Sequence, residues 1–109
     1  IWLKTTGKNI LLVCAGWKNN FNLEDTLFAG AVAEQLKGLN YIADDAAIAA
    51  NDLYQLGKND LNDYLKKTSH SERLKQLGIE ADIAFCLRVN ITTAIPVLQG
   101  DKLVKLSTN

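Results

Sequence analysis

Two adjacent carboxylates after a polar loop are the residues whose types and spacing best suit chemistry. Glu24 and Asp25 stand in the first turn of a predicted helix, and the loop before them contains Gly16 and Lys18. Magnesium takes one or two protein carboxylates and fills its other positions with water and phosphate oxygens. The segment therefore predicts a metal site at Glu24 and Asp25. Gly16, which permits close backbone approach, and Lys18, a cation, would bind an anionic substrate.

A second set of candidates lies further along the chain. His70 is the only histidine, and Arg73 follows it by one turn of a predicted helix. Histidine can bind an anion or protonate a leaving alkoxide, and the planar fork of arginine suits oxyanions. Arg88 follows an apolar run, at the edge where ligands of α/β proteins collect. We therefore expect His70 to be catalytic, and Arg73 and Arg88 to bind substrate.

Each of these residues also has a purely structural interpretation. Acids in a first turn stabilise a helix through its dipole, which explains Glu24 and Asp25 without any metal. A single surface histidine near a helix cap is common and need not do chemistry. The sequence leaves both interpretations open.

The apolar pattern predicts two buried strands, several helices and a final hairpin. The strands are expected at 9–15 and 83–87, where the apolar runs are nearly continuous. The hairpin is expected at 95–98 and 103–106, with Gly100 in its turn. Five helices are expected. The first is short and ends before Gly7, the second begins at the N-cap Asn22 and ends at Gly38 and Asn40, and the third begins at Asp44 or Asp45 and ends near Gly57. The fourth begins at Asn59 or Asp60, and the fifth begins with a capping box from Ser69 to Glu72 and ends before Gly78.

This order of elements predicts an α/β segment spanning residues 1–109 as a single unit. We expect a mixed sheet with helices on both faces and a C-terminal β-hairpin, as part of a larger α/β/α domain. Several helices between the two buried strands make a crossover long enough for a parallel pair. If these strands are parallel neighbours, Arg88 lies near the first loop. A helix that begins mid-turn at residue 1 indicates a cut or processed polypeptide.

Composition excludes several classes of protein. Twelve basic and twelve acidic residues give a formal net charge of zero, and the ten lysines and two arginines are scattered, so we expect no nucleic-acid partner. The apolar runs are too short to cross a membrane, so we expect no membrane-spanning segment and no membrane partner. Cys14 and Cys86 lie in apolar runs and form no disulfide framework, which fits a reducing cytoplasm.

Several blocks of the chain resemble the 2-phosphosulfolactate phosphatase family, in the family's order. The blocks span nearly the whole chain, and their combination is more specific than any one of them. They are Val13-Cys14-Ala15-Gly16, Leu23-Glu24-Asp25, Ala29-Gly30, Asp45 to Tyr54, Ser69-His70 with Arg73-Leu74, and Asp82 to Leu87.

The resemblance implies a magnesium-dependent phosphatase that converts 2-phosphosulfolactate to sulfolactate and phosphate in coenzyme M biosynthesis. Family members also have an N-terminal half with an Asp-x-x-Arg-Ala-Thr-like segment and an Asn-Gly-Thr segment, and neither occurs here. The chain therefore resembles the C-terminal half. It also carries Asn90 where the family pattern has an acid, which weakens any metal role at that position.

The sequence as a whole predicts the C-terminal portion of a magnesium-dependent phosphomonoester hydrolase, inactive by itself. Its substrate would be a small phosphorylated acid. The resemblance to the family implies that this acid also carries a sulfonate group. The rival hypothesis is a non-catalytic α/β binding or assembly module, in which the acidic residues only cap helices and the histidine has no chemical role. The sequence does not distinguish a monomer from a homodimer.

Overall fold

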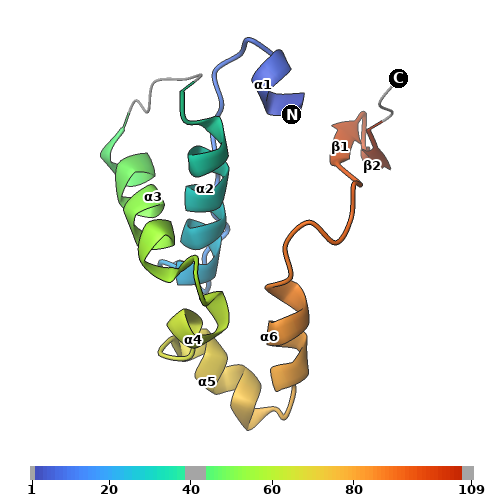
Figure 1. The fold of residues 1–109 in the computed structure, drawn as a ribbon. Helices are drawn as coiled ribbons and strands as arrows, with labels where there is room; N and C mark the ends of the chain where they lie inside the picture. The colour runs from blue at the N-terminus through green and yellow to red at the C-terminus, as the bar shows by residue number, and fades with distance from the viewer. Residues whose placement is uncertain (1, 39–43, 107–109) are drawn as a thin grey trace.

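The computed structural model describes residues 2–38 and 44–106, and in that part of the chain it shows six helices and one two-stranded sheet (Figure 1). This mixture of helix and strand agrees with the α/β class. The elements are α1 (Trp2–Thr5), α2 (Leu23–Leu36), α3 (Asp45–Gly57), α4 (Leu61–Leu65), α5 (Ser69–Gln76), α6 (Glu80–Cys86), β1 (Pro96–Gln99) and β2 (Lys102–Lys105).

Helices α2 and α3 lie side by side and form the main packed unit (Figure 1). Leu27 and Ala33 of α2 and Ala50 of α3 are buried. The helices approach closely because α2 has glycine at position 30: a Cβ there would overlap the carbonyl oxygen of Ala50. The core of the described structure is therefore small, and Leu65 of α4 completes it beside this pair.

A polar network also joins the two helices. The buried amide of Asn51 donates hydrogen bonds to the carbonyl oxygen of Gly30 at 3.2 Å and to Glu34 Oε2 at 3.1 Å. Glu34 also pairs with Lys37. The Lys37 ammonium first, and then the Asn51 amide, lower the pKa of the Glu34 carboxyl from 4.5 to about 2. The network thus favours the charged carboxylate in the folded state.

Most helix boundaries follow the predicted local signals. Asn22, Asp44 and Asp60 are the N-caps of α2, α3 and α4, and each side chain accepts hydrogen bonds from backbone N–H groups of its own helix. Gly7 and Gly78 follow α1 and α5 with φ angles of +62° and +70°. Asn40, predicted with Gly38 to end α2, lies outside the described residues.

The capping-box prediction is wrong by one residue. The N-cap of α5 is Thr68, whose hydroxyl accepts a hydrogen bond from the Ser71 N–H at 3.1 Å, so Ser69 is the first helical residue. Thr68 and Ser71 satisfy the cap without the predicted return bond from Glu72. A threonine next to a serine offers two equivalent N-caps, and the sequence pattern selected the wrong one.

Neither predicted buried strand forms in the described structure. Residues 9–15 are extended but belong to no sheet, and residues 83–86 lie in α6. A short apolar run fits a strand or a helix equally well, so the neighbours decide. No described strand lies beside 83–87, and helical hydrogen bonds then satisfy that backbone locally.

The predicted hairpin is confirmed, but the predicted mixed sheet is not formed in the described structure. β1 pairs antiparallel with β2, with Gln99 opposite Lys102 and a two-residue turn in which Gly100 has a φ angle of +63°. Because the two expected parallel strands are absent among the described residues, helices do not cover two faces of a sheet there.

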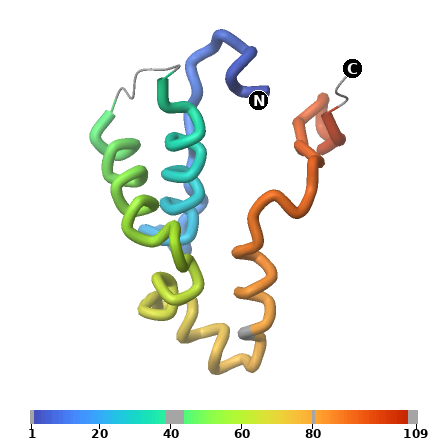
Figure 2. Tube along the Cα trace, in the orientation of Figure 1, coloured from blue at the N-terminus to red at the C-terminus, as the bar shows by residue number. Residues whose placement is uncertain are grey.

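The second half of the chain is more open than the α2–α3 pair. Figure 2 shows the chain descending through α4 and α5, turning, and rising through α6 toward the hairpin. Helices α5 and α6 contact each other, whereas Phe85 of α6 is 58% exposed. No helix within residues 2–38 and 44–106 combines the length and apolar character needed to cross a membrane.

Candidate functional site

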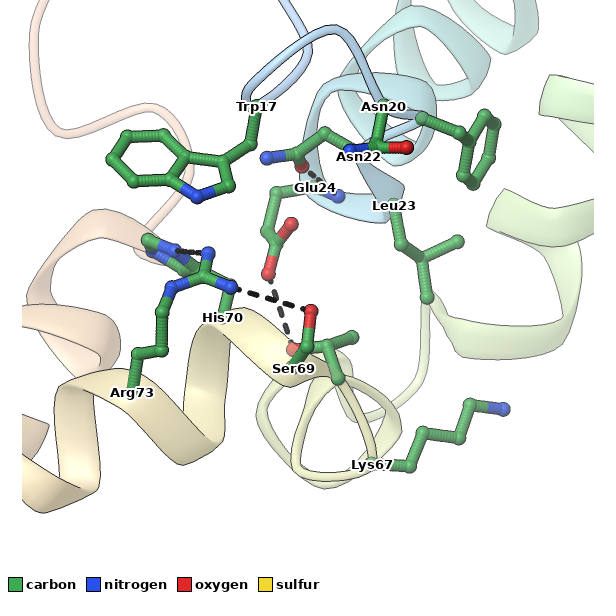
Figure 3. A pocket seen from close by; sticks show the side chains of 11 residues that line it. Trp17, Asn20, Asn22, Leu23, Glu24, Lys67, Ser69, His70 and Arg73 are labelled. Atoms are coloured by element: carbon green, nitrogen blue, oxygen red, sulfur yellow. Dashed lines mark hydrogen bonds between the residues drawn. The ribbon is translucent and has the colours of Figure 1, made fainter.

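A cleft of about 450 Å³ lies where the loop before α2 faces the start of α5 (Figure 3). One wall is the loop and the first residues of α2, and the other is the last residues before α5 with its first turn. Two cationic side chains and one carboxylate line the cleft. The lining residues are Trp17, Asn20, Phe21, Asn22, Leu23, Glu24, Lys67, Thr68, Ser69, His70 and Arg73.

A tight turn shapes the loop wall. Trp17 and Asn20 exchange two backbone hydrogen bonds, of 3.0 and 2.9 Å, around Lys18 and Asn19, which have φ angles of +49° and +62°. Gly16 precedes this turn with a φ angle of +69°, and a Cβ there would lie 2.7 Å from the carbonyl oxygen of Asn20. Gly16 is therefore required by the backbone shape that directs Trp17 to the cleft.

Asp25 of α2 forms a hydrogen bond with this loop. Its Oδ2 accepts a hydrogen bond from the Gly16 N–H at 2.8 Å, and the residue does not line the cleft. Asp25 and Glu24 are adjacent on the helix, and adjacent helical side chains do not face each other. The structure therefore gives the two predicted metal ligands different surroundings.

Glu24 lines the cleft and bridges its two walls. Its Oε1 accepts a hydrogen bond from the Thr68 hydroxyl at 3.2 Å, which joins α2 to the N-cap of α5 across 44 positions of sequence (Figure 3). Thr68 also caps α5, and its single hydroxyl proton is shared between Glu24 Oε1 and the nearer carbonyl oxygen of Leu65 at 2.8 Å. Glu24 thus lies within hydrogen-bonding distance of the opposite cleft wall.

Arg73 lies between His70 and Trp17. Its Nη2 is 3.1 Å from His70 Nδ1, its Nη1 donates to Ser69 Oγ at 3.4 Å, and its guanidinium lies 5.1 Å from the centre of the Trp17 ring (Figure 3). A guanidinium can only donate, so Nδ1 accepts and the ring proton of a neutral His70 is on Nε2. Trp17 adds a cation–π contact to the same guanidinium.

The structure brings together three of the predicted site residues, Glu24, His70 and Arg73. Lys18 lies on the turn with its ammonium 5.9 Å from the Trp17 ring, outside the cleft lining. Arg88 follows α6 and lies over the Phe85 ring at 5.9 Å, and is also outside that lining. Its expected place beside the loop depended on a parallel strand pair that does not form among the described residues.

Sequence reasoning missed Trp17, Thr68 and Lys67. Thr68 could have been found as an alternative N-cap directly before the Ser-His pair. Trp17 could have been found because a tryptophan in a polar loop exposes a large aromatic face to neighbours. Lys67 carried no distinguishing signal, since its neighbour Lys66 is also a lysine.

Glu24 is the one carboxylate among the residues that line the cleft. The described residues contain no cluster of three His, Cys, Asp or Glu side chains suited to hold a metal. Magnesium can bind a protein through one or two carboxylates together with water and substrate oxygens. Of the cleft residues only the Glu24 carboxylate would supply such a ligand, because the Thr68 hydroxyl beside it already contacts the Ser71 N–H and the Leu65 carbonyl oxygen.

Comparison with known proteins decides the family. The family described as 2-phosphosulpholactate phosphatase matches residues 2–101. The chain belongs to this family. A "Probable 2-phosphosulfolactate phosphatase" of Gloeobacter violaceus is 40% identical over 89 residues, covering 82% of this chain and 36% of the relative.

Two further relatives with the same printed name agree. The protein of Caldanaerobacter subterraneus is 37% identical over 100 residues, covering 91% of this chain and 42% of the relative. The protein of Thermotoga petrophila is 40% identical over 91 residues, covering 84% of this chain and 39% of the relative. The chain thus spans about two fifths of the length of these 2-phosphosulfolactate phosphatase relatives.

Proposed function

We propose that this chain forms the C-terminal, anion-binding part of a magnesium-dependent phosphomonoester hydrolase. The observation that carries the proposal is the convergence of Arg73, His70 and Glu24 in one cleft. Membership of the phosphatase family supports the reaction type. The proposed reaction is hydrolysis of 2-phosphosulfolactate to sulfolactate and phosphate, in the cytoplasm, where the exposed thiols of Cys14 and Cys86 would stay reduced.

The cleft residues divide between binding an oxyanion and holding a cation. Arg73 offers a planar fork whose direction is fixed by His70 and Trp17, which suits a phosphate or sulfonate. The Nε2–H of His70 is a second donor, so the geometry favours anion binding over proton transfer for this residue. Lys67 also lines the cleft, but its ammonium lies over the Tyr64 ring at 3.8 Å and is not assigned to the anion.

Glu24 is the residue proposed to hold magnesium, which when bound offsets negative charge on a phosphate oxygen. Asp25 acts on this site indirectly, because it fixes Gly16 and thereby the loop that carries Trp17. The remaining ligands and the rest of the substrate pocket would come from the part of the domain that matches the other three fifths of the relatives.

A chimera tests the function. The N-terminal part of the Gloeobacter violaceus relative is fused to residues 1–109, and phosphate release from 2-phosphosulfolactate with Mg²⁺ is compared with that of the chain alone and of the intact relative. We expect turnover by the chimera and none by the chain alone. Turnover by the chain alone would refute the incomplete-site proposal. A folded chimera with no turnover would favour a non-catalytic binding or assembly module.

Substitution of Glu24 then tests the metal role. Glu24→Gln in the chimera keeps side-chain size and removes one charge, and Glu72→Gln makes the same change at an exposed position outside the cleft. We expect Glu24→Gln to raise the Mg²⁺ concentration for half-maximal activity at least about tenfold, the lower limit for losing even an outer-shell partner. An equal Mg²⁺ requirement in the two variants would remove Glu24 from the metal site.

A further inference from the structure

The indole N–H of Trp17 is a hydrogen-bond donor that the cleft does not use. Trp17 is 49% exposed, and the nitrogen edge of its ring is turned toward His70 and Arg73 (Figure 3). Among the described residues that line the cleft, none accepts a hydrogen bond from this nitrogen. An indole N–H donates but does not accept, so only a group with an acceptor can use it. A ligand can therefore occupy this donor without breaking any bond within the cleft.

A tight turn fixes the place of the indole. The two backbone hydrogen bonds between Trp17 and Asn20 enclose Lys18 and Asn19, which both have positive φ angles. Asparagine tolerates this conformation, whereas lysine adopts it much less often. Such backbone strain costs free energy and is concentrated at active sites and ligand-binding positions. The turn therefore holds the ring ready for a ligand, which lowers the entropy lost on binding.

The neighbouring donors indicate the class of ligand. The Arg73 guanidinium has more N–H groups than its bonds to Ser69 and His70 require. Neutral His70 adds its Nε2–H, because its Nδ1 accepts from Arg73. The Trp17 ring lies 5.1 Å from the guanidinium, so its N–H belongs to the same group of donors. Several N–H groups around one cleft suit a tetrahedral oxyanion, which has several oxygens to accept them.

We propose that Trp17 binds the substrate by donating its indole N–H to the oxyanion that Arg73 holds. This inference rests on the proposed function, in which the cleft takes an anionic group of the substrate. Phosphate and sulfonate groups share the tetrahedral oxygens that the donor needs. The Trp17 ring also covers one face of the guanidinium, and exclusion of water there strengthens the attraction of Arg73 for the anion. Trp17 thus both contacts the ligand and positions the arginine.

The indole N–H resonances of the isotope-labelled chimera test the contact by nuclear magnetic resonance. Trp17→Phe and Trp2→Phe each remove one peak and so assign it, and Trp2 lies in α1, outside the cleft lining. Inorganic phosphate and methanesulfonate are titrated separately, against chloride at equal ionic strength. We expect a saturable shift of the Trp17 peak and none of the Trp2 peak. The anion with the stronger effect identifies the substrate group at Trp17. A Trp17 peak that moves with neither anion overturns the proposal.

Inhibition of the chimera by the anion with the stronger effect separates the N–H from the ring. Trp17→Phe keeps an aromatic face for Arg73 and removes the donor, and Trp2→Phe makes the same change at a residue that is 43% exposed. We expect only Trp17→Phe to raise the inhibition constant, about fivefold, the scale of one neutral hydrogen bond. Equal constants would contradict the contact. A shifted Trp17 peak in a chimera that releases no phosphate would keep the contact and reject hydrolysis. Turnover with an unmoved peak would do the reverse.

Discussion

The α2–α3 pair and segment 9–15 are near neighbours in the chain but differ in what covers their apolar residues. Leu27, Ala33 and Ala50 of the helices are buried, whereas Leu11 and Val13 of the segment are more than four-fifths exposed. Both regions are rich in aliphatic residues, so composition does not explain the difference. A helix satisfies its own backbone and needs only one partner surface, whereas a strand also needs neighbours for its hydrogen bonds.

The same contrast explains what could be predicted. The cap at Asn22 and the turn at Gly100 depend on a few adjacent residues, and the structure confirms both. Of the two candidates that the sequence offered for each of the next two helices, the structure selects Asp44 and Asp60. Segment 83–87 depends on distant partners, and its prediction as a strand is wrong. Local chemistry is therefore readable from one sequence, while sheet formation requires knowing which strands are present.

The candidate site was predictable to the same extent. Glu24 and His70 line one cleft and both stand in the first turn of a helix whose start the sequence marks to within a residue, and Arg73 follows His70 by one turn. The distinction between Glu24 and Asp25 was not predictable, since it depends on Gly16 and Thr68, which reach these carboxylates through the fold. Arg88 was misplaced because its position was derived from a strand that does not form in the described structure.

The largest expected loss of stability comes from truncating a buried leucine, and an exposed leucine provides the control. Leu27→Ala removes a side chain that is 4% exposed in the helix pair, and Leu103→Ala removes one that is 74% exposed in β2. The first should lower the free energy of unfolding by about 2–5 kcal/mol, because it leaves a cavity. The second should change it by about 0.5 kcal/mol or less. Chemical denaturation measures both, and similar losses would show that the helix pair is not the core.

Close approach of α2 and α3 is the next feature to break. Gly30→Ala introduces a Cβ that overlaps the Ala50 carbonyl, and backbone cannot swing aside as a side chain can. We expect a loss of about 1–3 kcal/mol despite the better helix propensity of alanine. Ala49→Val adds atoms at an exposed position of α3 and should cost about 0.7 kcal/mol at most. A more stable Gly30→Ala variant would contradict the described packing.

A smaller, pH-dependent effect is expected from Glu34. Its pKa in the folded chain is about 2, below the ordinary 4.5, so its contribution to stability is complete above pH 4.5 and is lost as the pH falls toward 2. The difference in unfolding free energy between wild type and Glu34→Gln should therefore shrink over this range. Lys37→Gln should reduce the same difference, because Lys37 is the main cause of the shift. A difference that is constant with pH would remove Glu34 from the network.

The inhibition constant of inorganic phosphate tests the central claim most directly, because phosphate is both the proposed product and the proposed occupant of the cleft. It is measured in the chimera, in Arg73→Lys and in Arg88→Lys, two substitutions that keep charge and lose the planar fork. We predict that Arg73→Lys raises the constant about tenfold, the scale of one charged hydrogen bond, and that Arg88→Lys raises it less. An unchanged constant in Arg73→Lys, or a larger rise in Arg88→Lys, would contradict the assignment of the cleft as the phosphate site.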